Sequence, residues 1–177
     1  FRRVLFRSRK NGKATCAVWR VAFPFFLAAF VASPLARLWP GPRTRALVAR
    51  RRALGLAFAT AQLVHGAMIL LYARHARGVL EPDASFVAGA IAFVFVGVMA
   101  ATSNDAAMRR LGARAWGALH RSGQWVLATV FAVTYAGRVA RDPAWGPGLA
   151  LIVAALALRL AAALLSRSLR SSTLPIE

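Results

Sequence analysis

Five long apolar runs are the feature of this sequence that most limits what the chain can fold into. They cover approximately residues 17–38, 53–72, 86–102, 119–136 and 148–165. A helix needs about 20 apolar residues to cross a bilayer, so runs of this length are typical of membrane spans. Backbone groups in lipid must be hydrogen-bonded within the span, which favours helices. The sequence predicts an all-α polytopic membrane helix bundle of about five transmembrane helices.

Composition supports this class and excludes others. The chain is 59% hydrophobic and 16% charged, whereas soluble domains are about 45–50% apolar and about 25% charged. A net charge of +19 is typical of nucleic-acid binding, but the arginines lie between apolar runs. We therefore expect the lipid bilayer, and no nucleic acid, as the partner of these charges. Too few residues remain outside the spans for a soluble catalytic domain.

The chain divides into three segments. Residues 1–8 read FRRVLFRS, which is what the end of a common short-read sequencing adapter gives on translation, and we expect them to be an artefact. Residues 9–170 are predicted to form one transmembrane domain that lacks an upstream helix. Residues 171–177 are predicted to be a cytoplasmic tail.

The charges between the runs predict the orientation. Arginines fill the predicted loops 37–52 and 109–114, with Asp105 as the only nearby acid, whereas the other two loops have a more balanced charge. Cytoplasmic loops carry the Lys/Arg excess. Both Arg-rich loops are therefore predicted to face the cytoplasm from a bacterial inner membrane.

Two histidines lie within the runs. His65 follows Arg52 by 13 positions, which places it about 20 Å into the span, and His120 follows Arg114 by six, about 9 Å. An intramembrane ionisable group is a functional candidate, and imidazole is an axial ligand of haem iron. Each could equally be a structural histidine. His75 is expected to be solvated in a loop.

Other chemistries lack their residues. The sequence contains no glycine-rich phosphate loop, no cluster at zinc-ligand spacing and no carboxylate inside a run. Arg159 is expected to extend its side chain towards the end of its span. We expect four glycines to mark close helix contacts: Gly55, Gly66, Gly89 and Gly97.

Several short segments together resemble the ferric-reductase-like transmembrane family. They are Ser33-Pro34-Leu35, Arg51-Arg52-Ala53-Leu54-Gly55-Leu56, Ala101-Thr102-Ser103-Asn104-Asp105, Arg109-Arg110-Leu111-Gly112 and Leu119-His120-Arg121. Within that family, the chain is most similar to the haem-binding membrane subunits of bacterial methionine-sulfoxide-reductase systems. The resemblance implies haem b, with His65 and His120 as ligands of the haem iron.

The chain departs from the family at one position. The family usually has another histidine about four turns after the position of His120, where this sequence has Val133. The nearby segment Thr134-Tyr135-Ala136-Gly137-Arg138 resembles a variant group with a tyrosine at this end of the helix, which makes Tyr135 a third cofactor-binding candidate. His65 and His120 are offset by about 10 Å in depth, so one haem shared between them and a haem held otherwise both stay open.

The implied function is electron transfer. The chain would be an electron-transfer subunit of an oxidoreductase, passing electrons from a cytoplasmic flavin or reductase partner to an external acceptor such as ferric iron or a periplasmic oxidoreductase. The flavin would be supplied by the partner or bound peripherally. The alternative is a haem-free degenerate relative that acts as a membrane scaffold or interaction subunit.

Overall fold

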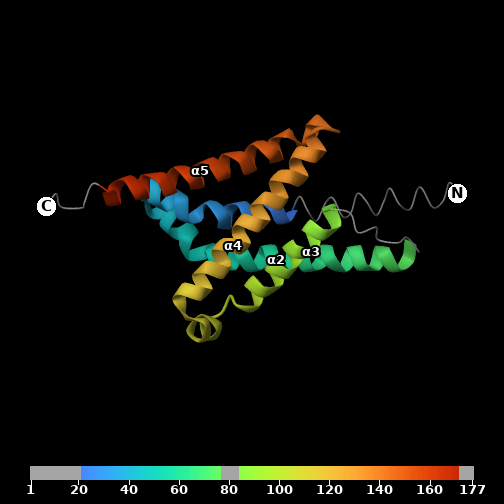
Figure 1. The fold of residues 1–177 in the computed structure, drawn as a ribbon, viewed down its shortest axis with the longest axis horizontal. Helices are drawn as coiled ribbons and strands as arrows, with labels where there is room; N and C mark the ends of the chain where they lie inside the picture. Colours follow the sequence, from blue (N-terminus) through green and yellow to red (C-terminus); the bar gives the residue numbers. More distant parts are fainter. Residues whose placement is uncertain (1–20, 77–83, 172–177) are drawn as a thin grey trace. The chain divides into compact units, whose positions relative to one another are not determined.

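The computed structural model describes residues 21–76 and 84–171, and these are helical with no strand among them. The helices are Val21–Leu38, α2 (Pro42–Ala76), α3 (Ala84–Ala101), α4 (Asp105–Val139) and α5 (Gly146–Ser171), with a short 3₁₀ helix, η1 (Pro143–Trp145), before α5. Figure 1 shows this succession of helices. The predicted all-α membrane helix bundle is confirmed. The predictions for residues 1–8 and for the loop between α2 and α3 concern residues outside this description.

The two Arg-rich segments are helical, which corrects the prediction of loops at 37–52 and 109–114. After the short break at residues 39–41, α2 begins at Pro42 and continues through the basic segment into the second apolar run. Proline suits the first helical position, and Ala, Leu and Arg are strong helix formers. The segment 109–114 lies in the first turns of α4, and His75 lies in the last turn of α2, not in a loop.

Gly112 interrupts α4 near its beginning. Its backbone has φ 76° and ψ 151°, a conformation that glycine adopts without the steric penalty of a side chain. The helix therefore consists of a short basic segment, residues 105–111, followed by the long apolar segment after the glycine. The glycine of the Arg109-Arg110-Leu111-Gly112 segment is required by this change of direction.

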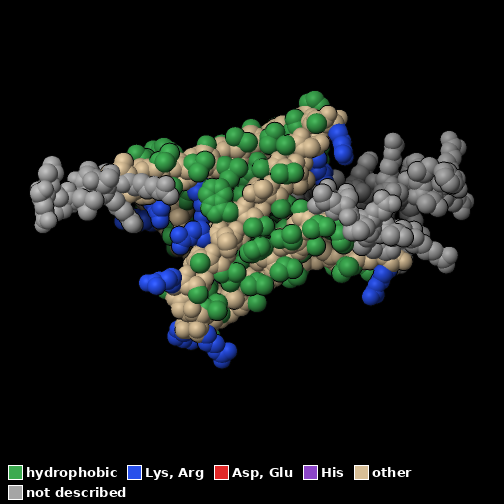
Figure 2. Space-filling model, viewed as in Figure 1, with side chains coloured by type: hydrophobic (Ala, Val, Ile, Leu, Met, Phe, Trp, Pro, Cys, Tyr) green, Lys and Arg blue, Asp and Glu red, His purple; other side chains and the backbone are tan. Residues whose placement is uncertain are grey.

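Three helical segments are individually long and apolar enough to cross a membrane: Val21–Leu38, Pro42–Leu71 and Pro143–Ser166. The segments Phe86–Ala101 and Asp105–Val139 satisfy the same test together and are bent by 115° at their junction. Large apolar side chains point outward along these helices, among them Leu63, Leu70, Leu160 and Leu164, each more than half exposed. Figure 2 shows hydrophobic side chains along the helices and Lys/Arg side chains gathered near helix ends. Lipid contact accounts for this apolar surface.

The described helices form two compact units. The first contains residues 21–26, 52–76 and 84–130, and the second contains residues 27–51 and 131–171. In the first unit, Phe26 packs on Phe58 of α2 with ring centroids 5.4 Å apart. Gly123 of α4 lies against Met99 of α3, where an added Cβ would come within 2.6 Å of the Met99 Sδ. Close packing of α4 on α3 therefore depends on a glycine that the sequence had not singled out.

In the second unit, an arginine side chain donates a hydrogen bond to the backbone of a helix that contains a proline. Arg159 lies in the middle of α5, and its Nη1 donates a hydrogen bond of 3.3 Å to the backbone oxygen of Phe30. Its guanidinium carbon also lies 4.3 Å from the centroid of the Phe30 ring. In a helix this oxygen would accept from the residue four positions later, which here is Pro34 and has no N–H. The arginine side chain replaces the missing donor, so the expectation that it reaches towards the helix end was wrong.

Of the four glycines expected at helix contacts, only one lies against a neighbour. A Cβ on Gly66 would come within 3.1 Å of the Phe93 ring, whereas Gly55, Gly89 and Gly97 have open space where a Cβ would stand. Small residues at helix interfaces allow close approach, but glycine on a lipid-facing surface has the same appearance in a sequence.

Candidate functional site

His65 lies on the buried face of α2, inside the apolar span Pro42–Leu71. Its side chain is 9% exposed, and its ring stacks on Phe93 of α3 with centroids 6.0 Å apart and an interplanar angle of 19°. The other buried residues of this face recur at helical spacing: Phe58, Ala59 and Gln62. Gly66 follows immediately and admits the Phe93 ring. An imidazole is thus held among aromatic and apolar groups within the span.

Gln62 accompanies His65 and was not proposed as a site residue from the sequence. It is 6% exposed, and its Oε1 is buried without a hydrogen-bond partner. Residues three positions apart lie on the same face of a helix, so this oxygen is presented one turn before His65. An unsatisfied buried acceptor costs about 1–3 kcal/mol, which a donor bound beside His65 would offset.

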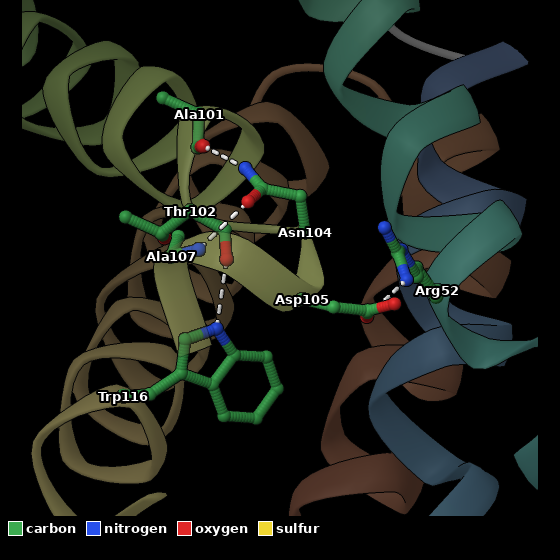
Figure 3. A network of polar contacts seen from close by, with 7 residues as sticks. All are labelled: Arg52, Ala101, Thr102, Asn104, Asp105, Ala107 and Trp116. Atoms are coloured by element: carbon green, nitrogen blue, oxygen red, sulfur yellow. Dashed lines mark hydrogen bonds and ion pairs between the residues drawn. The ribbon is translucent and has the colours of Figure 1, made fainter. Parts of the chain in front are cut away.

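The junction of α3 and α4 is formed by side chains that satisfy helix ends (Figure 3). Asn104 Oδ1 accepts a hydrogen bond from the backbone N–H of Ala107 at 2.7 Å, and Asn104 Nδ2 donates to the oxygen of Ala101 at 2.8 Å. The first is an N-cap and the second satisfies a carbonyl at the end of α3. The Thr102-Ser103-Asn104 segment is therefore required to end one helix and begin the next.

His120 belongs to this junction. Its Nε2 lies 3.2 Å from Thr102 Oγ1, and its ring stacks on Trp116 with centroids 4.1 Å apart. The indole Nε1 of Trp116 donates to the backbone oxygen of Thr102 at 2.8 Å (Figure 3). We call these three residues the turn cluster. The sequence indicated Thr102 only as part of a motif and did not single out Trp116, although the four-residue spacing of Trp116 and His120 places them on one helix face.

The two histidines contact α3 at different levels. His65 stacks on Phe93 in the middle of α3, whereas His120 bonds to Thr102, which directly follows the helix. Nine residues separate these two contacts, a rise of about 14 Å. Two axial ligands of one haem iron must lie at the same level on opposite faces of the macrocycle. The contacts of the two imidazoles with this part of the chain therefore lie at different levels.

Tyr135, the third predicted site residue, lies in the second unit. It is 4% exposed and packs on Phe131 and Trp145, with ring centroids 6.4 Å and 6.0 Å away. A Cβ on Gly148 would overlap its ring, so α5 contacts α4 closely here. Arg138 lies over the Trp145 ring at 4.5 Å. These contacts make Tyr135 part of a packed aromatic cluster at the junction of α4 and α5.

Each arginine of the Arg51-Arg52 pair has a partner. Arg52 Nη1 donates to Asp105 Oδ1 at 2.9 Å, and this exposed ion pair joins α2 to the beginning of α4 (Figure 3). Arg51 Nη1 donates to Ser33 Oγ at 3.0 Å within the second unit. The ion pair brings the beginning of the α2 apolar run and the α3–α4 junction to the same end of the first unit.

Comparison with known families fits this architecture. The family model described as "Ferric reductase like transmembrane component" matches residues 14–132, more than half of the chain. The chain belongs to this family. The matched range includes His65, the turn cluster and the Arg52–Asp105 pair, and ends before Tyr135. No curated protein and no solved structure matches the chain.

The residues present fit a haem at one of the two histidines. His65 offers a buried imidazole beside an aromatic ring and an unsatisfied acceptor, and imidazole is a ligand type that haem iron takes. His120 offers an imidazole whose Nε2 is already engaged by Thr102. In residues 21–76 and 84–171, no three His, Cys, Asp or Glu side chains are grouped as ligands of a metal ion.

Proposed function

We propose that this membrane protein is a b-type haem protein that carries electrons across the bilayer, with His65 as an axial ligand of the iron. The observation that carries the proposal is a buried histidine inside an apolar span, within a domain of the ferric-reductase-like family. Placing an ionisable group there is costly, so its position favours a function. A haem at this depth would supply one-electron redox chemistry within the hydrocarbon.

The chain's own residues would bind and shield the cofactor. The buried face of α2 presents His65, Phe93 of α3 limits the space beside its ring, and Gly66 allows this approach. Near His65 the outward side chains of α2 include Leu63, Val64 and Leu70, which would keep water from the site when the helix is in lipid. The proposal rests on His65 alone, and Tyr135 and His120 stay candidates for a second ligand.

Electrons would enter from the Arg-rich side. We propose that this side faces the cytoplasm of a bacterial inner membrane, because Lys and Arg concentrate on cytoplasmic ends. Exposed Arg109, Arg110 and Arg114 would attract an acidic flavin-containing reductase or anionic lipid. The acceptor would lie on the opposite side, with a periplasmic oxidoreductase as in methionine-sulfoxide-reductase systems, or ferric iron, as the proposed class.

Transmembrane electron transfer tests this function directly. Haem-loaded protein is reconstituted into liposomes that contain ferricyanide, and dithionite is added outside. We expect ferricyanide to be reduced faster than in empty liposomes, and the excess rate to be lost in His65→Ala. Equal rates in protein-containing and empty liposomes would contradict the proposal.

A haem-free scaffold is the second candidate function. The observation in its favour is that a structural hydrogen bond engages the Nε2 of His120, one of the two histidines that the family resemblance assigns to haem. Protein purified from haem-replete cells without a Soret band would favour the scaffold.

A further inference from the structure

The buried polar side chains of this chain lie next to each other. In residues 21–76 and 84–171 they are Gln62 and His65, apart from the aromatic Tyr135. Gln62 and His65 are three positions apart on α2, so they lie one turn from each other on one helix face. Both side chains therefore face the same part of the interior.

Gln62 differs in its contacts from other polar side chains of the spans. The Thr60 hydroxyl, on the exposed side of the same helix, donates to the backbone oxygen of Leu56 at 3.0 Å. Ser166 and Arg159 of α5 likewise donate to backbone oxygens. The Gln62 Oε1 is buried and has no hydrogen-bond partner among the residues that the structure describes. A buried acceptor without a donor destabilises a protein, so packing alone does not account for a glutamine at this position.

The position of Gln62 suits the donor that a ligating histidine provides. An imidazole that binds a metal ion through one ring nitrogen carries a hydrogen on the other, and donates it to a carboxylate, a carbonyl or water. Helix side chains tilt towards the N-terminus, so the His65 ring extends from its own turn towards the turn of Gln62. Cβ atoms three positions apart are separated by about 5–6 Å, which a glutamine side chain can span. Its amide oxygen is the carbonyl acceptor that such a ring needs.

We infer that Gln62 is a positioning residue for a haem-ligating histidine: its Oε1 accepts the ring N–H of His65 when the other ring nitrogen binds iron. The inference deepens the proposed function and rests on it for the assignment of the haem to His65. This hydrogen bond fixes the tautomer and the rotation of the ring, and it makes the imidazole a stronger electron donor, which favours ferric over ferrous iron. Gln62 therefore stabilises the haem-loaded protein and destabilises the haem-free protein.

Three substitutions on α2 separate this role from a packing role. Gln62→Met removes the amide at nearly the same side-chain length and leaves an apolar group. Gln62→Glu keeps a side-chain oxygen that accepts a hydrogen bond. Thr60→Val is the matched control, because it replaces a polar side chain by an apolar one of similar volume on the exposed side of the same helix.

The experiment measures three quantities on the full chain in detergent. The first is the melting temperature of haem-free protein, which we expect to rise in Gln62→Met because a buried acceptor without a donor is removed. The second is the rate at which excess apomyoglobin removes haem, which we expect to be about 10-fold or more faster in Gln62→Met, since losing such a partner weakens metal binding by that order. The third is the midpoint potential of the bound haem, which we expect to be highest in Gln62→Met and lowest in Gln62→Glu. Thr60→Val should leave all three at wild-type values.

A melting temperature lowered by Gln62→Met, with unchanged haem loss and midpoint potential, would overturn the inference, because Gln62 would then be a packing residue. Midpoint potentials equal to wild type in both Gln62 variants would overturn it as well. Failure of the proposed function looks different: wild-type protein then binds no haem, or His65→Ala retains haem with the wild-type midpoint potential. Either of these results removes the proposed function and the inference together, whereas haem that depends on His65 and not on Gln62 removes the inference alone.

Discussion

Arg159 is predicted to stabilise the second unit by replacing the donor that Pro34 lacks. The perturbation is Arg159→Leu, which removes both the hydrogen bond to Phe30 and the contact with its ring. To isolate the hydrogen bond, the same change is made in Pro34→Ala, where the alanine N–H can bond to Phe30 in the ordinary helical way. The difference between the two backgrounds is a coupling energy.

The magnitude follows from the geometry. Hydrogen bonds to charged groups contribute about 1.5–3 kcal/mol, but hydrogen bonds between membrane helices average only about 0.6 kcal/mol. At 3.3 Å the bond is long, so we expect a coupling of about 1–1.5 kcal/mol. The contact with the ring is worth about 0.5–2 kcal/mol and cancels in the cycle, because Arg159→Leu removes it in both backgrounds.

Unfolding by sodium dodecyl sulfate in mixed micelles, followed by circular dichroism, measures these free energies. We expect Arg159→Leu to be more destabilising in the wild-type background than in the Pro34→Ala background, and Pro34→Ala alone to be neutral or stabilising. A control cycle pairs Arg159→Leu with Pro24→Ala, the other proline of the helix Val21–Leu38, and should give a coupling within about 0.5 kcal/mol of zero. Equal couplings in the two cycles would refute the reasoning.

Two further predictions concern a tightly packed contact and an exposed ion pair. Gly148→Ala places a Cβ against the Tyr135 ring and should destabilise the protein by about 1–3 kcal/mol. Combining it with Tyr135→Leu should recover most of this loss. A melting temperature unchanged by Gly148→Ala would contradict this packing. Asp105→Asn removes an ion pair whose side chains are 54% and 69% exposed, so it should change the free energy of unfolding by less than about 1 kcal/mol. A loss several times larger in detergent at moderate salt would show that the Arg52–Asp105 pair is not a surface interaction.

The sequence predicted the helical class and the positions of the apolar spans because lipid leaves few alternatives for an apolar run of that length. It could not predict that the basic segment before residue 53 continues the helix. Charge marks a segment as outside the hydrocarbon, but Arg, Ala and Leu favour helix on either side of the interface. The extent of α2 therefore depends on local propensity, which the hydropathy pattern does not report.

The candidate site was predicted in part. His65 could be found because a single imidazole in an apolar run is unusual, and its burial agrees with that reading. The engagement of His120 could not be found, since it depends on where the Thr102 hydroxyl directs its hydrogen. The sequence does show that Pro34 leaves the backbone oxygen of Phe30 without its usual donor. Only the fold shows that the side chain of Arg159 reaches this oxygen.

The most direct test of haem binding at His65 is the dithionite-reduced minus oxidised spectrum of wild-type and His65→Ala protein purified from haem-replete cells. The matched control is His75→Ala, in the same helix and at its far end. We predict a haem difference spectrum in wild type and in His75→Ala, and none in His65→Ala at equal protein recovery. A spectrum in His65→Ala equal in size to that of wild type would contradict the assignment of the haem to this residue.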